Sequence, residues 1–445
     1  MQASQATVTE NPRHPDNIVI VGGGAGGLEL ACKLGRQFGR SRVTLIDCRL
    51  SHIWKPSLHE VAAGTLDIHQ EGLSYQMLAH DNGFTFVYGP LTALDAEARR
   101  LSVAAVRNDA GEVMIPQREL TYACLCIAVG SVSNYFGVPG AREHTISLNA
   151  TEDAERFRLK MLELLTMAEM RKETGHEAGV DIVIIGGGAT GVELAAELRE
   201  ASGVYADYGF RRLDPGRDVR ITLLEGAPRI LAPLPERVSS AAIRLLAKRH
   251  VTVVAGCRVT DIRANSVTDA EGVTRPADIC VWAAGIKAPE LLATLGLPTN
   301  KAGQLEVTGH LTIKGFADIY AIGDCAACPN AEGGLVPPRA QAAHQQADYL
   351  FEVLQHRFAG KPAPAHPYVY RDYGSLVSIG QQTTVGSLMG SLKGLSWFVE
   401  GFYARIMYMS LHLMHHRAIL GTLRTAVLAL GRFLVKRTTA LVKLH

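Results

Sequence analysis

Two stretches of the chain share one order of hydrophobic and polar positions. Each begins with a short apolar run, Ile18 to Val21 in the first and VDIVII from residue 180 in the second, and passes through a glycine turn into a helix-forming segment. A further apolar run follows each helix and ends at an acid, Asp47 and Glu225 respectively. Continuous apolar runs of this length are typical of parallel strands covered on both faces. The repeat predicts an α/β fold with two doubly wound, Rossmann-like units.

Weaker patterns divide the rest of the chain. An amphipathic helix is expected from Thr151, and the apolar runs ACLCIAV and ICVW lead into glycine turns near residues 130 and 285. From Pro367, tyrosines, β-branched residues and regular glycines predict antiparallel strands, and beyond Gly394 the pattern becomes helical and basic. We therefore expect one unit from residues 1–145 and 291–385, a second from 146–290, and a C-terminal region from 386–445.

Composition narrows the class of protein. The 445 residues are 47% hydrophobic and 20% charged, an ordinary globular balance for a chain that can form two or three packed units. The N-terminal segment lacks the apolar core of a secretory signal, so the protein is expected to stay in the cytoplasm. The eight cysteines show no disulfide spacing and are expected to be buried thiols. No pattern indicates nucleic-acid binding.

Charge is distributed unevenly along the chain. The net charge is +2, yet seven Lys or Arg and no Asp or Glu follow Glu400, so the preceding residues are net negative. On a helical wheel one side of the tail gathers Leu423, Val427, Leu430, Leu434 and Leu441, and the other gathers Arg424, Arg432, Lys436 and Lys443. This pattern is typical of a helix that lies in a membrane surface. No uncharged apolar run is long enough to cross a bilayer, and a helix docked on the core or in a dimer interface is the alternative.

The first glycine turn predicts a dinucleotide site. Gly22, Gly24 and Gly27 follow G-x-G-x-x-G, in which the first glycine permits a tight turn, the second admits a pyrophosphate and the third packs helix on strand. The phosphate then meets the positive end of the helix. Gly26 lies in the same turn, and Asp47 is placed to accept hydrogen bonds from a ribose.

The second turn repeats this arrangement with Gly186, Gly188 and Gly191. Glu225 takes the acidic position, where it would repel a 2′-phosphate, so this site is expected to prefer NADH to NADPH; nearby Arg229 leaves that preference open. Glu193 lies in the first turn of the helix, where the macrodipole favours an acid with or without a chemical role.

The segment DIYAIGDCA supplies a third part. An apolar strand delivers Gly323 and Asp324 to a turn, which resembles the segment of two-dinucleotide flavoproteins whose aspartate holds the ribityl chain and phosphate of the flavin. The strand and glycine turns ahead of it add Gly130 to the first site and Ala284 and Gly285 to the second. This order predicts noncovalent FAD in the first unit and NADH in the second.

A glutamine-rich helix is expected after this turn. Pro337 or Pro338 should begin it, because proline lacks the N–H that a first helical turn leaves unpaired. It follows Asp324 closely, so its N-terminus should point toward the isoalloxazine ring and stabilise the reduced ring through free N–H groups. Gln341 and Gln345 share one helical face and are expected to line a pocket for a carbonyl-bearing acceptor such as a quinone.

Two other patterns are given structural interpretations. Cys325 and Cys328 form C-x-x-C, but they do not stand where disulfide reductases of this flavoprotein class carry their reactive pair, so a redox role is the less favoured alternative. His412, His415 and His416 lack carboxylate or cysteine support for a metal. A solvated or interfacial histidine cluster is expected there, and no metal is assigned.

The sequence resembles bacterial type II NADH dehydrogenase over nearly its whole length. The resemblance is carried by both glycine turns and by HIWKPSLHEVAAGTLD, GDCAACP, PPRAQAAHQQA, YRDYGSLVSIG and GSLMGSLKGLSWFVEG. It implies a two-dinucleotide-binding flavoprotein, usually a homodimer, anchored by its C-terminal region as a peripheral protein on the cytoplasmic face of the bacterial inner membrane. The implied activity is transfer of two electrons from NADH to ubiquinone or menaquinone without proton pumping.

The same resemblance assigns residues. The family's quinone motif A-Q-x-A-x-Q falls on Ala340, Gln341, Ala343 and Gln345, and Lys393 is a looser match near the quinone channel. It places Glu193 near the nicotinamide and the flavin. Lys55, in the first of the quoted motifs, is assigned to FAD, and Gln341 is assigned to FAD as well as to the quinone.

Two other functions stay open from the residues alone. A sulfide:quinone oxidoreductase shares the fold and the tail but requires essential cysteines beside the flavin. A membrane-associated flavoprotein redox sensor would be reoxidised only slowly by quinones.

Overall fold

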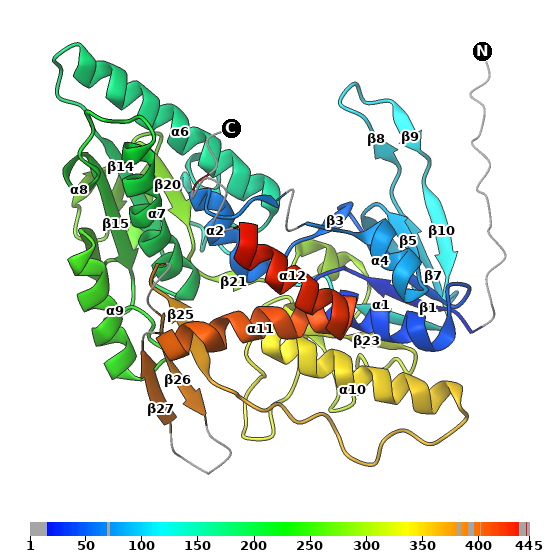
Figure 1. Ribbon diagram of the computed structural model, residues 1–445. Helices are drawn as coiled ribbons and strands as arrows, with labels where there is room; N and C mark the ends of the chain where they lie inside the picture. The colour runs from blue at the N-terminus through cyan, green and yellow to red at the C-terminus, as the bar shows by residue number, and fades with distance from the viewer. Residues whose placement is uncertain are drawn as a thin grey trace, which may run out of the picture.

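The computed structural model describes residues 16–68, 72–380, 384–389, 396–400, 402–435 and 442, and it contains two parallel five-stranded sheets (Figure 1). In the first sheet the strands lie in the order β23-β11-β1-β2-β5. Their bounds are β1 Ile18–Val21, β2 Val43–Asp47, β5 Thr85–Tyr88, β11 Cys124–Ile127 and β23 Ile319–Ala321. A strand from the segment 291–385 therefore completes the first sheet.

The second sheet has the strand order β13-β20-β14-β15-β16. Its strands are β13 Ile146–Ser147, β14 Val180–Ile185, β15 Val219–Glu225, β16 Val251–Ala255 and β20 Ile279–Trp282. All residues of β20 are buried, as are those of β1 and β11, because helices or loops cover the central strands on both faces. The predicted strand ends at Asp47 and Glu225 are confirmed.

Helices pack against both sheets (Figure 1). They are α1 Ala25–Phe38, α2 Leu58–Ala63, α4 Tyr75–Asn82, α5 Ala141–His144, α6 Thr151–Glu173, α7 Ala189–Asp207, α8 Pro215–Asp218, α9 Glu236–Lys248 and α10 Ala340–Phe358. The predicted start of α6 at Thr151 is confirmed. Although α2 comes from the first unit in sequence, it packs against α6 and α7, so the two units share part of one core.

Short additional strands lie outside the two five-stranded sheets, and they pair antiparallel except for the parallel pair formed by Leu305–Glu306 and Ala326–Ala327. Two three-stranded sheets consist of β6 Leu91–Asp95, β7 Arg100–Val103 and β10 Arg118–Thr121, and of β17 Val259–Arg263, β18 Ser266–Asp269 and β19 Thr274–Pro276. The paired strands are β3 Ser51–His52 with β4 Leu73–Ser74, β8 Val106–Arg107 with β9 Val113–Ile115, β12 Val132–Ser133 with β21 Ile286–Lys287, and β22 Leu305–Glu306 with β24 Ala326–Ala327.

The predicted antiparallel strands after Pro367 are confirmed. They are β25 Ser375–Ser378, β26 Thr384–Met389 and β27 Ser396–Glu400, which pair in that order. The expectation that helix follows directly after Gly394 was wrong for residues 396–400. The run SWFVE is rich in aromatic and β-branched residues, and β26 offers it an antiparallel partner.

Two helices end the described chain, α11 Phe402–Leu420 and α12 Thr422–Val435. Figure 1 shows α11 (orange) running from β25 and β26 toward α1, with α12 (red) lying over it, and α11 contacts β25, β26 and α1. Ile419, near its end, is buried in the core of the first unit. Among the residues described, no helix combines the length and apolar character needed to cross a membrane.

Candidate functional site

The first glycine turn has the geometry that the sequence predicts. Gly22 has a φ of +104°, and a Cβ at this position would lie 2.4 Å from the carbonyl oxygen of Ala128. A Cβ at Gly27 would lie 2.0 Å from the carbonyl oxygen of Gly22, so α1 meets the turn closely. Among the described residues, nothing lies within 4 Å of a Cβ at exposed Gly24. The turn is closed at its first and third glycines and open at the second, which fits an approaching pyrophosphate.

The second glycine turn, at the carboxyl end of β14, repeats this geometry. Gly186 has a φ of +114°, a Cβ at Gly191 would lie 1.9 Å from the carbonyl oxygen of Gly186, and Gly188 is open and exposed. Ala284 and Gly285 follow β20, the neighbouring strand of the sheet, so they lie at the same sheet edge. Both turns therefore have room for a dinucleotide phosphate at a helix N-terminus.

The two predicted ribose acids bind the glycine turns themselves. An oxygen of Asp47 accepts a hydrogen bond from the N–H of Gly23 at 2.6 Å, and an oxygen of Glu225 accepts one from the N–H of Gly187 at 2.6 Å. Each acid thus fixes the end of its strand against the neighbouring turn. Contact of these carboxylates with a ribose stays a prediction.

Gly26 allows two helices to approach each other. A Cβ at this position would lie 2.9 Å from the carbonyl oxygen of Ala343, on α10. The close approach brings the N-terminal turns of α1 and α10 together beside the first glycine turn. The predicted contact of Gly26 with FAD remains a prediction.

The predicted segment with Gly323 and Asp324 follows β23, which pairs with β11 in the first sheet. Asp324 accepts a hydrogen bond from the Ser131 hydroxyl at 2.7 Å, and the Lys55 ammonium donates to the Ser131 carbonyl at 3.2 Å. Gly130 has a φ of +69° and nothing within 4 Å of a Cβ, and Gly323 has a φ of +76°. Residues predicted separately for FAD therefore gather in one place. Ser131 was missed, although its position directly after Gly130 could have signalled it.

Glu193 is the fifth residue of α7, so the prediction that it lies in the first turn of this helix was wrong, and its carboxyl group is buried. One oxygen accepts a hydrogen bond from the N–H of Ser378 at 3.0 Å, and the other lies 3.7 Å from Nδ1 of His59. Burial raises the pKa of Glu193 to about 7, against the opposing effect of His59. Burial lowers the pKa of His59, but Glu193, Glu60 and Glu197 raise it more, so the net pKa is raised. The pair can hold a proton near neutral pH.

His59 is a functional candidate that the sequence reading missed. It lies in HIWKPSLHEVAAGTLD, a motif quoted only for the family resemblance. Its Nδ1 has no hydrogen-bond partner among the described residues, and its side chain is buried. An unpaired buried nitrogen 3.7 Å from a carboxylate is a place where a proton can move.

Gln341 and Gln345 bind backbone in the segment 371–374. The amide of Gln341 donates to the carbonyl of Gly374 at 3.0 Å and accepts from the N–H of Tyr373 at 3.2 Å. The amide of Gln345 donates to and accepts from the backbone of Arg371 at 2.8 and 2.9 Å. The glutamines share one face as predicted, and this structure shows them attaching α10 to that segment. Their role toward a quinone stays a prediction, and Lys393 lies outside the described residues.

The predicted start of the glutamine-rich helix was wrong by two or three residues. α10 begins at Ala340, with Arg339 as an extended N-cap residue. Consecutive prolines disfavour helical conformation in the residue before each, and Arg339 is held outside the helix by an ion pair with Asp372 at 2.9 Å. The free N–H groups of the first turn therefore begin at Ala340, immediately beside Gln341.

Seven of the eight cysteines are buried and all eight are free. Burial raises the pKa of Cys325 to about 12 and that of Cys328 to about 11. A thiol that stays protonated at neutral pH is a poor nucleophile, so both behave as structural thiols. Only Cys48 is exposed.

Comparison with known proteins identifies the family to which this chain belongs. The sequence profile of the family described as pyridine nucleotide-disulphide oxidoreductase matches residues 16–347. A type II NADH:quinone oxidoreductase from Haemophilus influenzae is 36% identical over 96% of this chain and 100% of its own length. The chain belongs to the type II NADH:quinone oxidoreductases.

Solved structures agree with the fold. A structure of NDH2 from Plasmodium falciparum in complex with NADH has a TM-score of 0.81, 19% identity, and covers 97% of this chain and 100% of its own. The sulfide:quinone oxidoreductase from Aquifex aeolicus has a TM-score of 0.68 and 18% identity, covering 92% of each chain. At these identities the likeness concerns the fold alone. As a type II NADH:quinone oxidoreductase, the protein is a flavoprotein oxidoreductase that uses FAD and NADH.

Proposed function

We propose that this chain transfers two electrons from NADH through FAD to a membrane quinone without pumping protons, and so feeds a respiratory chain. The observation that carries the proposal is the pair of equivalent glycine turns, each open at its second glycine and each at the edge of its own parallel sheet. Two separate dinucleotide sites in a chain that matches a type II NADH:quinone oxidoreductase along its full length fit this activity.

Each cofactor has its own set of residues. FAD is assigned to Gly22, Gly24, Gly26, Gly27, Asp47, Lys55, Gly130, Gly323, Asp324 and Gln341, and NADH to Gly186, Gly188, Gly191, Glu193, Glu225, Ala284 and Gly285. When bound, FAD supplies the chemistry that accepts a hydride from NADH and releases electrons to the quinone. The chain binds and orients both dinucleotides and excludes water between them.

The quinone is assigned to the N-terminus of α10. Ala340, Gln341 and Gln345 stand there, with Lys393 as the looser assignment. The first N–H groups of α10 carry partial positive charge, which favours electron density on a nearby carbonyl oxygen.

Glu193 and His59 are suited to supply a proton. Their facing atoms, a carboxylate oxygen of Glu193 and Nδ1 of His59, are 3.7 Å apart, and the raised pKa of the carboxyl group allows it to be protonated near neutral pH. Reduction of a quinone consumes two protons, and an acid with a pKa near 7 matches that demand.

Stopped-flow spectroscopy of the full chain loaded with FAD tests the proposed function. Mixing with NADH is expected to bleach the flavin absorbance rapidly, and subsequent mixing with a soluble quinone is expected to restore it rapidly. Slow recovery with every quinone would contradict the quinone assignment and favour a redox sensor. As a control, the variant with Cys325 and Cys328 replaced by alanine should cycle normally, since a sulfide:quinone oxidoreductase would require reactive cysteines.

Membrane attachment is assigned to α12. Leu423, Val427 and Leu430 are 79%, 64% and 60% exposed, so an apolar stripe faces outward from this helix. Arg424 beside them pairs with Asp81. A helix of this kind lies in the headgroup region, where about 1 kcal/mol comes from each basic residue near an anionic surface. We assign the protein to the cytoplasmic face of the bacterial inner membrane as a peripheral homodimer.

Changing Leu423, Val427 and Leu430 together to glutamate is expected to release the protein from vesicles of anionic phospholipid. The three side chains are exposed, so folding and FAD content should be unchanged, while three charges replace the apolar contact. Vesicle sedimentation measures the bound fraction, which should fall at least tenfold. The matched control changes Leu159, Met167 and Met170 to glutamate, three exposed apolar residues of α6. Equal loss in both variants would show that charge alone, not this face, governs binding.

A further inference from the structure

A chain of hydrogen bonds joins the first glycine turn to the tail helix. The carbonyl oxygen of Gly23 lies 2.9 Å from Nδ1 of His52, and Nε2 of His52 lies 2.9 Å from Nε2 of His415, on α11. Nδ1 of His415 lies 2.6 Å from one oxygen of Glu29, on α1. The other oxygen of Glu29 contacts Nδ1 of His344, on α10. The chain thus joins α1 and β3, which lie near each other in the sequence, to α10 and α11, which follow much later.

Water has little access to this chain. His52, His415 and Glu29 are 5%, 2% and 1% exposed. The ring of Trp54 lies against that of His415, with centroids 4.3 Å apart and an interplanar angle of 34°, and so covers the imidazole. Each hydrogen bond of the chain therefore has to be satisfied within the protein.

The identity of the hydrogen-bonding atoms determines which nitrogen of His52 is protonated. A carbonyl oxygen only accepts, so Nδ1 of His52 carries a proton and donates it to Gly23. Burial, followed by the charge of His415, lowers the pKa of His52 to about 3, so its ring is neutral and its Nε2 accepts. The proton between the two rings consequently belongs to Nε2 of His415.

The other end of the chain places a second proton on the same ring. Burial raises the pKa of Glu29, but hydrogen bonds from His344 and His415 and their charges lower it to about 2 overall. Glu29 is therefore a carboxylate, and the proton of the 2.6 Å contact lies on Nδ1 of His415. His415 therefore faces a hydrogen-bond acceptor at each ring nitrogen, Nε2 of His52 and an oxygen of Glu29.

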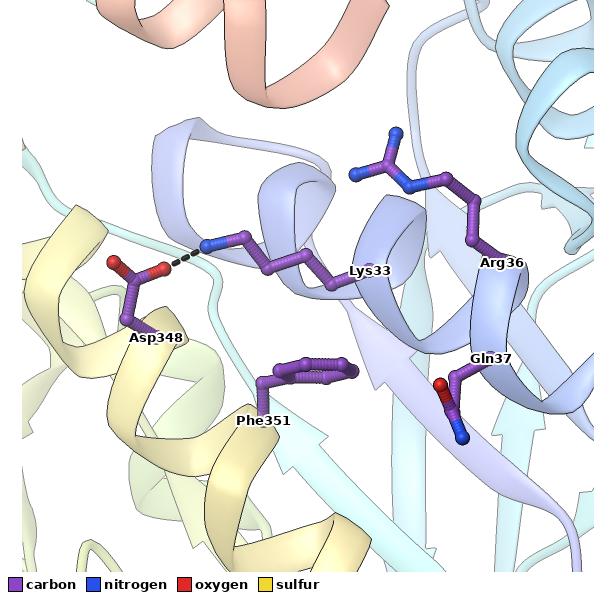
Figure 2. A pocket seen from close by; sticks show the side chains of 5 residues that line it. All are labelled: Lys33, Arg36, Gln37, Asp348 and Phe351. Atoms are coloured by element: carbon purple, nitrogen blue, oxygen red, sulfur yellow. Dashed lines mark ion pairs between the residues drawn. The ribbon is translucent and has the colours of Figure 1, made fainter. Parts of the chain in front are cut away.

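A metal ion is a weaker interpretation of the same region. Glu29, His344 and Asp348 offer three ligand atoms within 4.8 Å of one another. Figure 2 shows the ammonium group of Lys33 pointing at Asp348, with which it forms an ion pair. Both oxygens of Glu29 already contact histidines. Each carboxylate of this group therefore already has a side-chain partner within the protein.

We propose that His415 and His52 are positioning residues of the first glycine turn. The ring of His415, carried by the tail helix, donates to Nε2 of His52 and so fixes His52 as the Nδ1–H tautomer, and His52 holds the carbonyl of Gly23. The proposal rests on the assignment of this turn to the phosphates of FAD. Tyr75 donates to the same carbonyl at 2.7 Å, and Asp47 accepts from the N–H of Gly23. Through His415 and His52, the packing of α11 adds a third hydrogen bond that holds Gly23 in place.

Nitrogen NMR of the FAD-loaded full chain, labelled with ¹⁵N-histidine, tests the protonation pattern directly. At pH 7 we expect one ring with both nitrogens protonated and one neutral ring protonated at Nδ1. The variants His415→Gln and His52→Asn assign the two signals. A His52 ring protonated at Nε2, or a His415 ring with one bare nitrogen, would overturn the proposal.

Affinity for FAD tests the consequence. His52→Phe keeps a ring of similar size but loses the donor to Gly23, and we expect the Kd for FAD to rise about tenfold. His52→Asn should recover most of this loss, because its amide can donate from the place of Nδ1. The double variant Glu29→Leu/His415→Phe removes the buried ion pair without leaving a lone charge, and its Kd should rise about fivefold.

The matched control is His412→Phe, one turn earlier on α11. Nε2 of His412 has no hydrogen-bond partner among the described residues, so this change should leave the Kd for FAD unchanged. A Kd within twofold of the native value in His52→Phe would contradict the proposal, as would an equal effect of His412→Phe. These readouts do not use quinone reduction, so a native protein that binds FAD but fails to reduce quinone would contradict only the proposed function.

Discussion

Replacing Gly22 by alanine is expected to abolish FAD binding and to lower the free energy of unfolding by about 3 kcal/mol. Gly22 has a φ of +104°, which an alanine adopts only with strain. The new Cβ would lie 2.4 Å from the carbonyl oxygen of Ala128, in a backbone turn that cannot rotate away. Thermal unfolding and the flavin absorbance of the purified protein measure the two effects.

Gly24→Ala is the control for this prediction. Gly24 has a φ of −68° and nothing within 4 Å of its Cβ, so alanine fits the protein itself. We expect the free energy of unfolding of the apoprotein to stay within about 0.5 kcal/mol of native. Affinity for FAD should still fall, because the methyl group occupies the open side of the turn. If Gly24→Ala unfolds as readily as Gly22→Ala, the opening at the second glycine has been misjudged.

Replacing Glu193 by glutamine is expected to lower kcat for quinone reduction by about 10- to 100-fold. Glutamine can still accept the hydrogen bond from Ser378, but it cannot carry the exchangeable proton beside His59. The native rate of quinone reduction should fall as pH rises through about 7, where Glu193 loses that proton, and the variant should lack this step. Steady-state kinetics between pH 5.5 and 8.5, a window set by this pKa, measures both.

The raised pKa of Glu193 also predicts the direction of a stability change. A carboxyl group whose folded pKa exceeds its unfolded value stabilises the fold most below the unfolded pKa, and that contribution is lost as pH rises through about 7. The midpoint of thermal unfolding of native protein should therefore decline more between pH 6 and 8 than that of Glu193→Gln. An identical decline in both proteins would show that Glu193 does not titrate in this range.

Glu197→Gln provides the matched control, one turn further along α7. Glu197 is also buried, and burial raises its pKa. Its oxygen accepts a hydrogen bond from Thr65 at 2.6 Å, and among the described residues it forms no ion pair with His59. We expect kcat within threefold of native for this variant. A comparable loss in both variants would assign the effect to the buried charge of α7 in general.

The local pattern of apolar, acidic and glycine residues predicted most of the strands and turns correctly. The apolar runs that became β1 and β14 and the acids that end β2 and β15 are read correctly because buried parallel strands must be continuously apolar. The roles of the glycines follow equally well, since a tight turn and a close helix approach depend on neighbouring backbone. Residues 396–400 were misjudged because a short aromatic run becomes a strand only when another strand lies beside it.

What the sequence by itself determined is therefore the two glycine turns and their strands, which are set by interactions within one strand–helix–strand unit. Only the tertiary structure decided that His52 meets His415, that His59 faces Glu193, and that Gln341 binds the backbone near Gly374. These contacts join positions up to 363 residues apart. No local periodicity encodes such pairings, because they arise when separately formed elements pack and each buried polar atom finds a partner.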